Sequence, residues 1–145
     1  MLLPYFNSIY LFQEERPEIH LFSDTSQKGL GAYFISTSEV SIQQENSFSI
    51  LVKDNHLSQY INILELQAIQ AAFLTWAQIW SQKTVIVHTD SKVAFWVLTN
   101  HKAYSPAFYL LCYILLLVST YNVIIQPVHI PGITNDIADT LSRFK

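Results

Sequence analysis

The residues of this chain best suited to chemistry are a few carboxylates in apolar surroundings. Asp24 and Asp90 each directly follow a short apolar run, and Glu65 and Asp139 lie in segments with helical spacing of apolar residues. Carboxylates so close to a core are costly unless they are paired, hydrogen-bonded or bound to a metal ion. A cluster of hard oxygen ligands suits Mg²⁺ or Mn²⁺ rather than zinc. The four residues are therefore candidates for a metal site.

Each of these carboxylates also has an ordinary structural explanation. Glu65 stands three residues after Asn62, as in a capping box. Asp90 could cap the following helix, Asp24 could begin a turn, and Asp139 could be a surface position. These explanations require four separate coincidences, so the joint placement favours a common site.

The elements that must position these residues follow from hydrophobic periodicity and turn residues. Strands are predicted at residues 20–23, 31–36, 47–52, 84–88 and 123–129, and helices at 63–81, 91–98, from a Ser105–Pro106 start, and at 135–143. The early hairpins are antiparallel, and the later strands, separated by helices, run parallel to the first. This order predicts an α/β fold with a mixed five-stranded sheet flanked by helices. Strands 1–3 are antiparallel, and strands 4 and 5 run parallel to strand 1. Asp24 and Asp90 then meet at the carboxyl ends of neighbouring strands, where ligands gather.

The composition fits one folded domain. Of 145 residues, 50% are hydrophobic and 13% are charged, which allows a sizeable core and argues against disorder. The net charge is −3, whereas a free-standing nucleic-acid binder usually carries a basic face. Affinity for a polyanion would therefore depend on metal ions or a neighbouring domain. The single cysteine, Cys112, excludes an internal disulfide, and its apolar surroundings predict a buried side chain.

Two apolar segments raise the question of targeting or membrane insertion. Residues 1–12 lack a basic start and a small-residue cleavage site. We therefore expect residues 1–18 to be a linker or the end of a preceding domain, and residues 19–145 to be the domain itself. Residues 103–128 carry no charge, which makes a membrane span an alternative. Prolines and polar residues interrupt that run, so a core helix followed by a strand is favoured and no membrane is expected.

Several short motifs together resemble the type 1 ribonuclease H family. They are Ser23-Asp24-Thr25-Ser26 with Gly29-Leu30-Gly31-Ala32, Glu65-Leu66-Gln67-Ala68, Thr89-Asp90-Ser91, and His129-Ile130-Pro131-Gly132 followed by Asn135 to Arg143. The last stretch looks like the closing motif of the ribonuclease H domain in gypsy-like and DIRS-like retrotransposon reverse transcriptases. The resemblance covers residues 19–143, and it rests on the order and spacing of the motifs rather than on any one of them.

The resemblance implies a two-metal active site. Asp24, Glu65, Asp90 and Asp139 match the four metal-binding carboxylates of the family, which hold two Mg²⁺ ions that Mn²⁺ can replace. Asp24 would bridge the ions, Glu65 and Asp90 would hold the ion near the leaving group, and Asp139 would hold the ion that activates water. His129, ten residues before Asp139, matches a histidine that assists proton transfer or product release. Without the motif, His129 would be read as a surface residue ending a strand.

The resemblance also implies supporting residues. Ser26, Asn62 and Lys92 match positions that contact the substrate, where contacts with 2′-hydroxyl groups select RNA. Asn135 matches an asparagine that supports the last helix. Thr25 departs from the family, since Gly or Ala is commoner there, and Lys92 stands where some members have an uncharged residue.

The implied function is an endonuclease that hydrolyses the RNA strand of RNA–DNA hybrids during reverse transcription. The short connection at 100–105 leaves no room for the basic protrusion with which free-standing members grip the hybrid. We therefore expect a partner polymerase domain upstream in the same polyprotein, and an intracellular setting in the host cytoplasm, nucleus or retroelement particles. The alternatives are a non-catalytic connection or scaffold module of the same fold and an integrase- or resolvase-like DNA nuclease. The four retained carboxylates favour activity, and Glu65 and His129 favour ribonuclease H.

Overall fold

The computed structural model of the chain describes residues 17–26, 28–36, 46–51 and 61–143. The strands are β1 (Glu18–Thr25), β2 (Gly29–Ser36), β3 (Ser47–Leu51), β4 (Thr84–Thr89) and β5 (Ile124–His129). The helices are α2 (Ile61–Trp76), α3 (Lys92–Asn100), α4 (Ala107–Thr120) and α5 (Asp136–Arg143), and a short 3₁₀ helix (Gly132–Thr134) precedes α5. Residues 1–16, most of the expected linker, lie outside the described residues.

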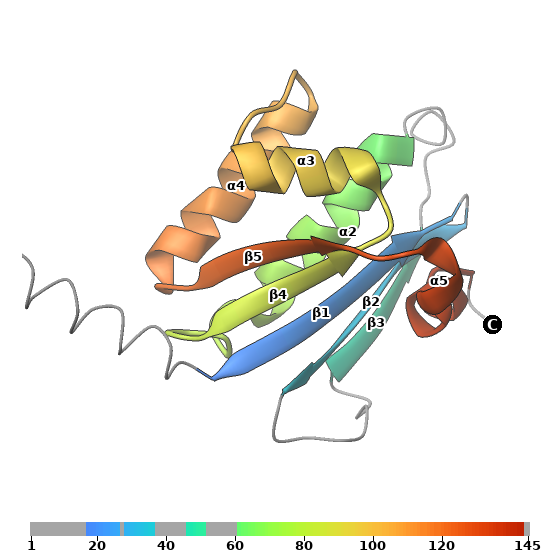
Figure 1. The fold of residues 1–145 in the computed structure, drawn as a ribbon, viewed down its shortest axis with the longest axis horizontal. Helices are drawn as coiled ribbons and strands as arrows, with labels where there is room; N and C mark the ends of the chain where they lie inside the picture. The colour runs from blue at the N-terminus through green and yellow to red at the C-terminus, as the bar shows by residue number, and fades with distance from the viewer. Residues whose placement is uncertain (1–16, 27, 37–45, 52–60, 144–145) are drawn as a thin grey trace, which may run out of the picture.

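The five strands form one mixed sheet in the order β3-β2-β1-β4-β5 (Figure 1). β1 pairs antiparallel with β2, and β2 with β3, as expected for strands that follow one another directly in the chain. β4 pairs parallel with β1, and β5 with β4, because helices carry the chain back between them. This topology confirms the predicted fold class.

One face of the sheet packs against α2, and α2 in turn packs against α4. The reason is the alternation of side chains in β1. Ile19 and Leu21 point to this face and are fully buried, together with Phe73 and Trp80 from the helical side. α3 covers β4 and β5 on the same side (Figure 1). The main hydrophobic core therefore lies between the sheet and the three helices α2, α3 and α4.

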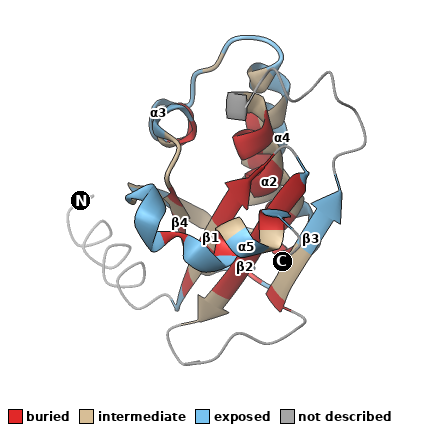
Figure 2. Cartoon of the chain, turned by 90° about the vertical axis from the view of Figure 1, so that its right-hand side faces the viewer, coloured by how far each residue is buried: buried red, intermediate tan, exposed pale blue. Residues whose placement is uncertain are grey.

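The opposite face carries α5, which contacts β1, β2 and β3 (Figure 2). The helix approaches closely at Gly31, where an added Cβ would lie 2.6 Å from the Cβ of Leu141. Two strand hydroxyls fix the helix end: Ser26 Oγ donates to the Ser142 carbonyl and Ser49 Oγ to the Leu141 carbonyl, each at 2.7 Å. α5 therefore covers only the part of this face that lies near the end of β1.

Two predicted helix starts are wrong. α2 begins at Ile61, before the predicted start at residue 63, so Asn62 lies inside the helix and not at its N-cap position. α4 begins at Ala107 with Pro106 at the N-cap position and no side-chain cap, so Ser105 does not cap it. Both predictions relied on cap preferences, which tertiary packing overrides when a neighbouring residue starts the helix.

The prediction that Cys112 is buried is also wrong. The side chains of Leu111 and Ile114 in α4 point into the core. The two residues between them, 112 and 113, are exposed. Cys112 is exposed there, on a side that also carries the exposed aromatic residues Phe108, Tyr109 and Tyr113. The expected helix and strand within residues 103–128 are confirmed by α4 and β5. Among the described helices, none combines the length and the apolar character needed to cross a bilayer.

Candidate metal centre

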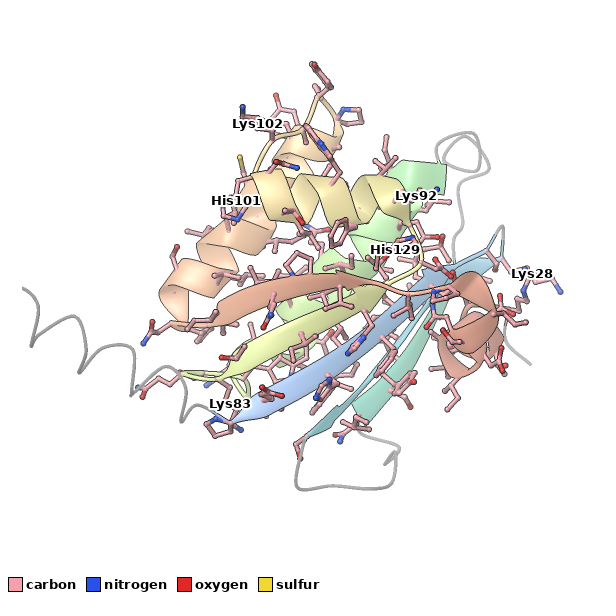
Figure 3. All side chains as sticks on the ribbon, in the orientation of Figure 1. Lys28, Lys83, Lys92, His101, Lys102 and His129 are labelled. Atoms are coloured by element: carbon pink, nitrogen blue, oxygen red, sulfur yellow. The ribbon has the colours of Figure 1, made fainter. Side chains whose placement is uncertain are left out.

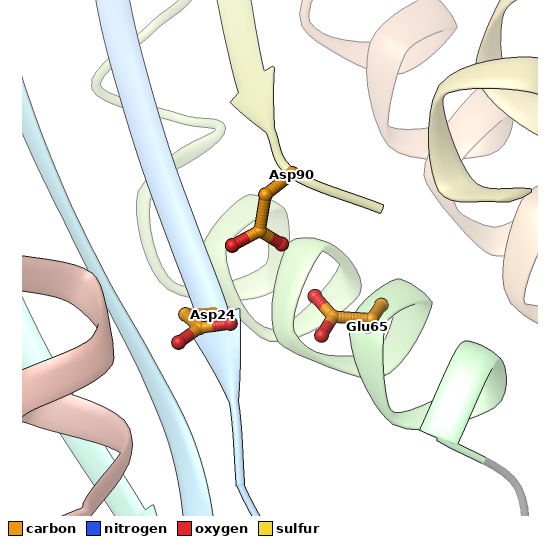
Figure 4. Close-up of side chains that lie close together, drawn as sticks. All are labelled: Asp24, Glu65 and Asp90. Carbon is orange, nitrogen blue, oxygen red and sulfur yellow. The ribbon is translucent and has the colours of Figure 1, made fainter. Parts of the chain in front are cut away.

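Three carboxylates converge where β1 and β4 end. Asp24 is the next-to-last residue of β1, Asp90 follows β4 directly, and Glu65 comes from the N-terminal part of α2. One carboxylate oxygen from each lies within 4.8 Å of the others (Figure 4). Parallel pairing of β1 with β4 brings the two aspartates to one edge, and the packing of α2 on β1 brings the glutamate there.

The ordinary explanations of these residues do not hold. The N-cap of α3 is Ser91, whose side chain accepts a hydrogen bond from the Ala94 N–H at 3.1 Å, so Asp90 is not needed as a cap. Glu65 lies beyond the first turn of α2 and accepts a hydrogen bond from Thr25 Oγ1 at 2.7 Å instead. Asp24 is 7% exposed, which a simple turn residue would not be.

Burial and mutual repulsion disfavour the charged forms of two carboxyl groups. Desolvation is the main cause that raises the pKa of Asp24 to about 7, and the charge of Asp90 adds to it. Desolvation also raises the pKa of Glu65 to about 8, against the lowering effect of the Thr25 hydrogen bond. A cation between the groups would offset both causes, so the electrostatics fit a metal site.

Asp139 adds a fourth carboxylate from α5. Its hydrogen bond with Asp24 and its charge contribute to the raised pKa of Asp24, which places the two side chains together. Asp139 Oδ1 also accepts a hydrogen bond from Arg143 Nε at 2.8 Å, one helical turn later. The Asp139 side chain is 42% exposed, and it does not belong to the group of three carboxylates whose oxygens lie within 4.8 Å of one another.

Asn135 connects α5 to the site. Its Nδ2 donates to the Ser23 carbonyl at 2.9 Å and lies 3.4 Å from Asp90 Oδ2. The side chain is 1% exposed, so these bonds are made away from water. Asn135, directly before α5, is therefore connected to β1 and to Asp90, and its role as a supporting residue stays a prediction.

The remaining predicted site residues are Lys92, His129, Ser26 and Asn62. Lys92 and His129 are exposed at the end of the sheet where β4 and β5 finish, whereas Lys83 lies at the opposite end (Figure 3). The ring of His129 lies 6.2 Å from that of Phe95. Ser26 is buried, and its hydroxyl serves the turn and α5, so contact with a substrate stays a prediction. The side chain of Asn62 lies outside the described residues.

Thr25 is the site residue that sequence reasoning missed. Its hydrogen bond to Glu65 joins residues 40 positions apart in the chain. The only available signal was its departure from the residue types commoner after the first aspartate. That signal pointed to a looser approach of a substrate, and it gave no indication of the contact with Glu65.

No protein-family model matches the chain, and no curated protein matches it either. Solved structures do match. The N-terminal RNase H domain of Rv2228c from Mycobacterium tuberculosis has a TM-score of 0.67 at 18% identity, over 88% of this chain and 97% of that one. The chain has a ribonuclease H-like fold. RNase H1 from the archaeon Halobacterium salinarum has a TM-score of 0.62 at 19% identity, over 87% of this chain and 93% of that one.

A viral protein shows the same fold as one part of a longer chain. The foamy viral protease-reverse transcriptase, solved in complex with an RNA/DNA hybrid, matches with a TM-score of 0.63 at 16% identity. The match covers 92% of this chain and 20% of the viral one. All these identities are low, so the comparisons establish the fold, and the chemistry depends on the residues of this chain.

The donor set fits a hard divalent cation. The converging ligand atoms are all carboxylate oxygens, the type that Mg²⁺ and Mn²⁺ prefer. Glu65 Oε2 is buried and has no hydrogen-bond partner among the described residues. A buried carboxylate oxygen is costly without a hydrogen-bond donor or a cation, and a metal ion at the cluster would supply the cation.

Proposed function

We propose that this chain is a ribonuclease H that hydrolyses the RNA strand of RNA–DNA hybrids with the help of two Mg²⁺ ions. The observation that carries the proposal is the convergence of Asp24, Glu65 and Asp90 at the strand ends of a ribonuclease H-like fold, with Asp139 beside them. The raised pKa values of Asp24 and Glu65 support it, because they indicate a site built for a cation.

Each residue of the site has a role that follows from its position. Asp24 and Asp90 would hold the metal ions from the ends of β1 and β4, and Glu65 and Asp139 would hold them from α2 and α5. When bound, such a pair of ions activates water and stabilises the leaving oxygen of the phosphodiester. To His129, which is exposed at the end of β5, we assign assistance in the movement of a proton or the release of product. Recognition by backbone shape and 2′-hydroxyl groups implies little sequence preference.

We further propose that the domain, residues 19–145, works within the reverse transcriptase of a gypsy-like or DIRS-like retroelement, inside the host cell. The likeness to part of a foamy viral reverse transcriptase supports this context. The net charge of −3 supports it as well, because weak intrinsic attraction to a hybrid is tolerable when an upstream polymerase domain holds the hybrid. The short connection between α3 and α4 offers little additional surface for that purpose.

The test is cleavage of an end-labelled RNA–DNA hybrid by the chain in Mg²⁺ and in Mn²⁺. Single-stranded RNA and duplex DNA serve as competing substrates, and Asp90→Asn serves as the matched variant. We expect cutting of the RNA strand of the hybrid alone, and loss of that cutting in the variant.

Two other results would redirect the proposal. No cutting, even with the upstream polymerase domain supplied, would indicate a non-catalytic scaffold module. Cutting of duplex DNA by the wild-type chain would indicate an integrase-like nuclease.

A further inference from the structure

The hydroxyl group of Thr25 makes the two carboxylate oxygens of Glu65 different, because it donates a hydrogen bond to only one of them. Thr25 Oγ1 donates to Glu65 Oε1 at 2.7 Å, and both residues are 7% exposed. The hydrogen bond is therefore shielded from water and is made to a carboxylate, which is the strong type of side-chain hydrogen bond. Glu65 Oε2 is buried as well, but within the described part of the chain nothing donates to it.

The position of Thr25 in β1 explains why it can make this contact. Successive residues of a strand point to opposite faces of the sheet. Asp24 pairs with Gly31 on the face covered by α5, so Thr25 points to the face covered by α2, where Glu65 lies. The end of β1 thus contributes twice to the cluster: Asp24 supplies a carboxylate, and Thr25 donates a hydrogen bond to the carboxylate of Glu65.

A glutamate side chain has enough rotatable bonds to present either oxygen, or both, to a cation. The Thr25 hydrogen bond removes much of that freedom, because rotating the carboxylate would leave a buried hydroxyl and a buried oxygen without partners. The remaining oxygen, Oε2, belongs to the residue that lies within 4.8 Å of the ligand atoms of Asp24 and Asp90 (Figure 4). The hydrogen bond therefore occupies one oxygen of Glu65 and leaves the other, Oε2, without a donor among the described residues.

We propose that Thr25 is a positioning residue that reserves Glu65 Oε2 for a divalent cation and makes Glu65 a one-oxygen ligand. This inference rests on the proposed function, since it concerns the same metal site. It explains a threonine at a place where the family resemblance favours Gly or Ala, neither of which could hold the glutamate.

The experiment measures Mn²⁺ binding by titration calorimetry, together with the kinetics of hybrid cleavage. The chain is compared with Thr25→Val, which keeps the shape and removes the hydroxyl, and Thr25→Ser, which keeps the hydroxyl. Asp90→Asn is the reference for a lost ligand. Circular dichroism and thermal unfolding show that each variant is folded, and Thr25→Ala is a second hydroxyl-free variant if Thr25→Val does not fold.

We expect Thr25→Val to weaken Mn²⁺ binding by about tenfold or more, the effect typical of groups that orient metal ligands. Its kcat should fall at saturating hybrid with little change in KM, because the hydroxyl does not touch the substrate. Thr25→Ser should restore most of both losses, which a merely structural role of the threonine methyl group would not predict.

Other outcomes separate this inference from the proposed function. If Thr25→Val binds Mn²⁺ as the wild type does while Asp90→Asn does not, the role of Thr25 is wrong and the metal site stands. If Thr25→Ser is as impaired as Thr25→Val, the hydroxyl is not the determinant and the inference is again overturned. A wild-type chain that neither binds Mn²⁺ nor cuts the hybrid would overturn both.

Discussion

Two groups of titratable side chains lie along β1 and β4, and they differ in how their polar atoms are satisfied. His20, Phe22 and Asp24 alternate along β1 and share the face that carries α5. α5 covers the end with Asp24, whereas His20 and Phe22 are only half-buried. The acidic cluster therefore lies at the covered end, and a cluster of histidines and aromatic rings lies at the open end.

In the histidine cluster, the two imidazole rings satisfy each other's hydrogen-bonding capacity. His20 Nδ1 and His88 Nε2 are 3.0 Å apart and share a hydrogen bond across the parallel pair β1 and β4. The ring of Phe22 stacks on that of His88 at 4.3 Å and on that of Tyr33 at 4.9 Å. Glu18 lies 3.6 Å from His20 Nε2 on its solvent side. A neutral histidine offers one donor and one acceptor, so two of them can pair without any ion.

The acidic cluster can pair in this way only by taking up protons, as the raised pKa values of Asp24 and Glu65 indicate. An ionised carboxylate only accepts hydrogen bonds, so adjacent carboxylates repel each other. Burial disfavours charge in both clusters, since it lowers the pKa of His88 and raises the pKa of Asp24 and Glu65. The comparison shows that burial alone does not indicate a metal site. A metal site is indicated instead by several carboxyl groups that lie close together and can ionise together only when a cation lies between them.

The largest expected effect is the loss of a ligand from the acidic cluster. Asp24→Asn should reduce hybrid cleavage by more than the roughly 10- to 100-fold typical of residues that only orient ligands. Without metal, the same variant should unfold at a higher denaturant concentration, because it removes a buried like charge. Single-turnover cleavage and urea unfolding measure the two effects. A variant that cuts at the wild-type rate would contradict the assignment of Asp24.

The next effect concerns α5, the helix that covers the Asp24 end of this sheet face and leaves the His20 end open. Gly31→Ala places a Cβ 2.6 Å from the Leu141 Cβ, so α5 must move away from the sheet. Overpacking of this kind costs about 1–3 kcal/mol of the free energy of unfolding, measured in urea. Gly132→Ala is the matched control, since its nearest contact, Asp90 Oδ2 at 3.6 Å, is an ordinary one. Equal stability of both variants would show that the close approach of α5 is not required.

The third effect is a pH dependence that metal should cancel. The pKa of Glu65 is raised from 4.5 to about 8, so its contribution to the metal-free fold is fully present below the lower value and is lost as pH rises through the higher one. The stability of the wild type relative to Glu65→Gln should therefore decline over that range. Added Mg²⁺ should remove the decline, because binding stabilises the ionised cluster. Urea unfolding across the range tests this, and a relative stability that rises with pH would contradict it.

The smallest effect is expected at the histidine cluster. Burial and the charge of His20 lower the pKa of His88 from 6.5, so its contribution to stability is present above that value and is lost as pH falls below it. His88→Phe keeps a ring for stacking and loses one hydrogen bond, at a cost of about 1 kcal/mol near neutral pH. It should leave Mn²⁺ affinity and cleavage unchanged in calorimetry and kinetics. A marked loss of Mn²⁺ affinity or of cleavage in this variant would contradict the prediction and show that the histidine cluster affects the metal site.

The sequence by itself determined the order of the elements and the strand ends that meet. Alternation and helical spacing report which side of each element is buried, and the rule for parallel strands then brings Asp24 and Asp90 to one edge. The boundaries of α2 and α4 were less well determined, because cap preferences are weak compared with packing. The exposed position of Cys112 depended on the rotational setting of α4, which a uniformly apolar helix does not encode.

Only the tertiary structure decided how Glu65 is used. In the sequence it had the spacing of a capping-box residue, and the contact that holds it comes from Thr25, 40 residues earlier. The pairing of His20 with His88 across 68 residues likewise depended on the register of two strands. Local patterns fix which face a side chain occupies, because that choice involves only its neighbours along the chain. Which atom then lies opposite is set by long-range register and helix packing, and these are decided only when the whole domain folds.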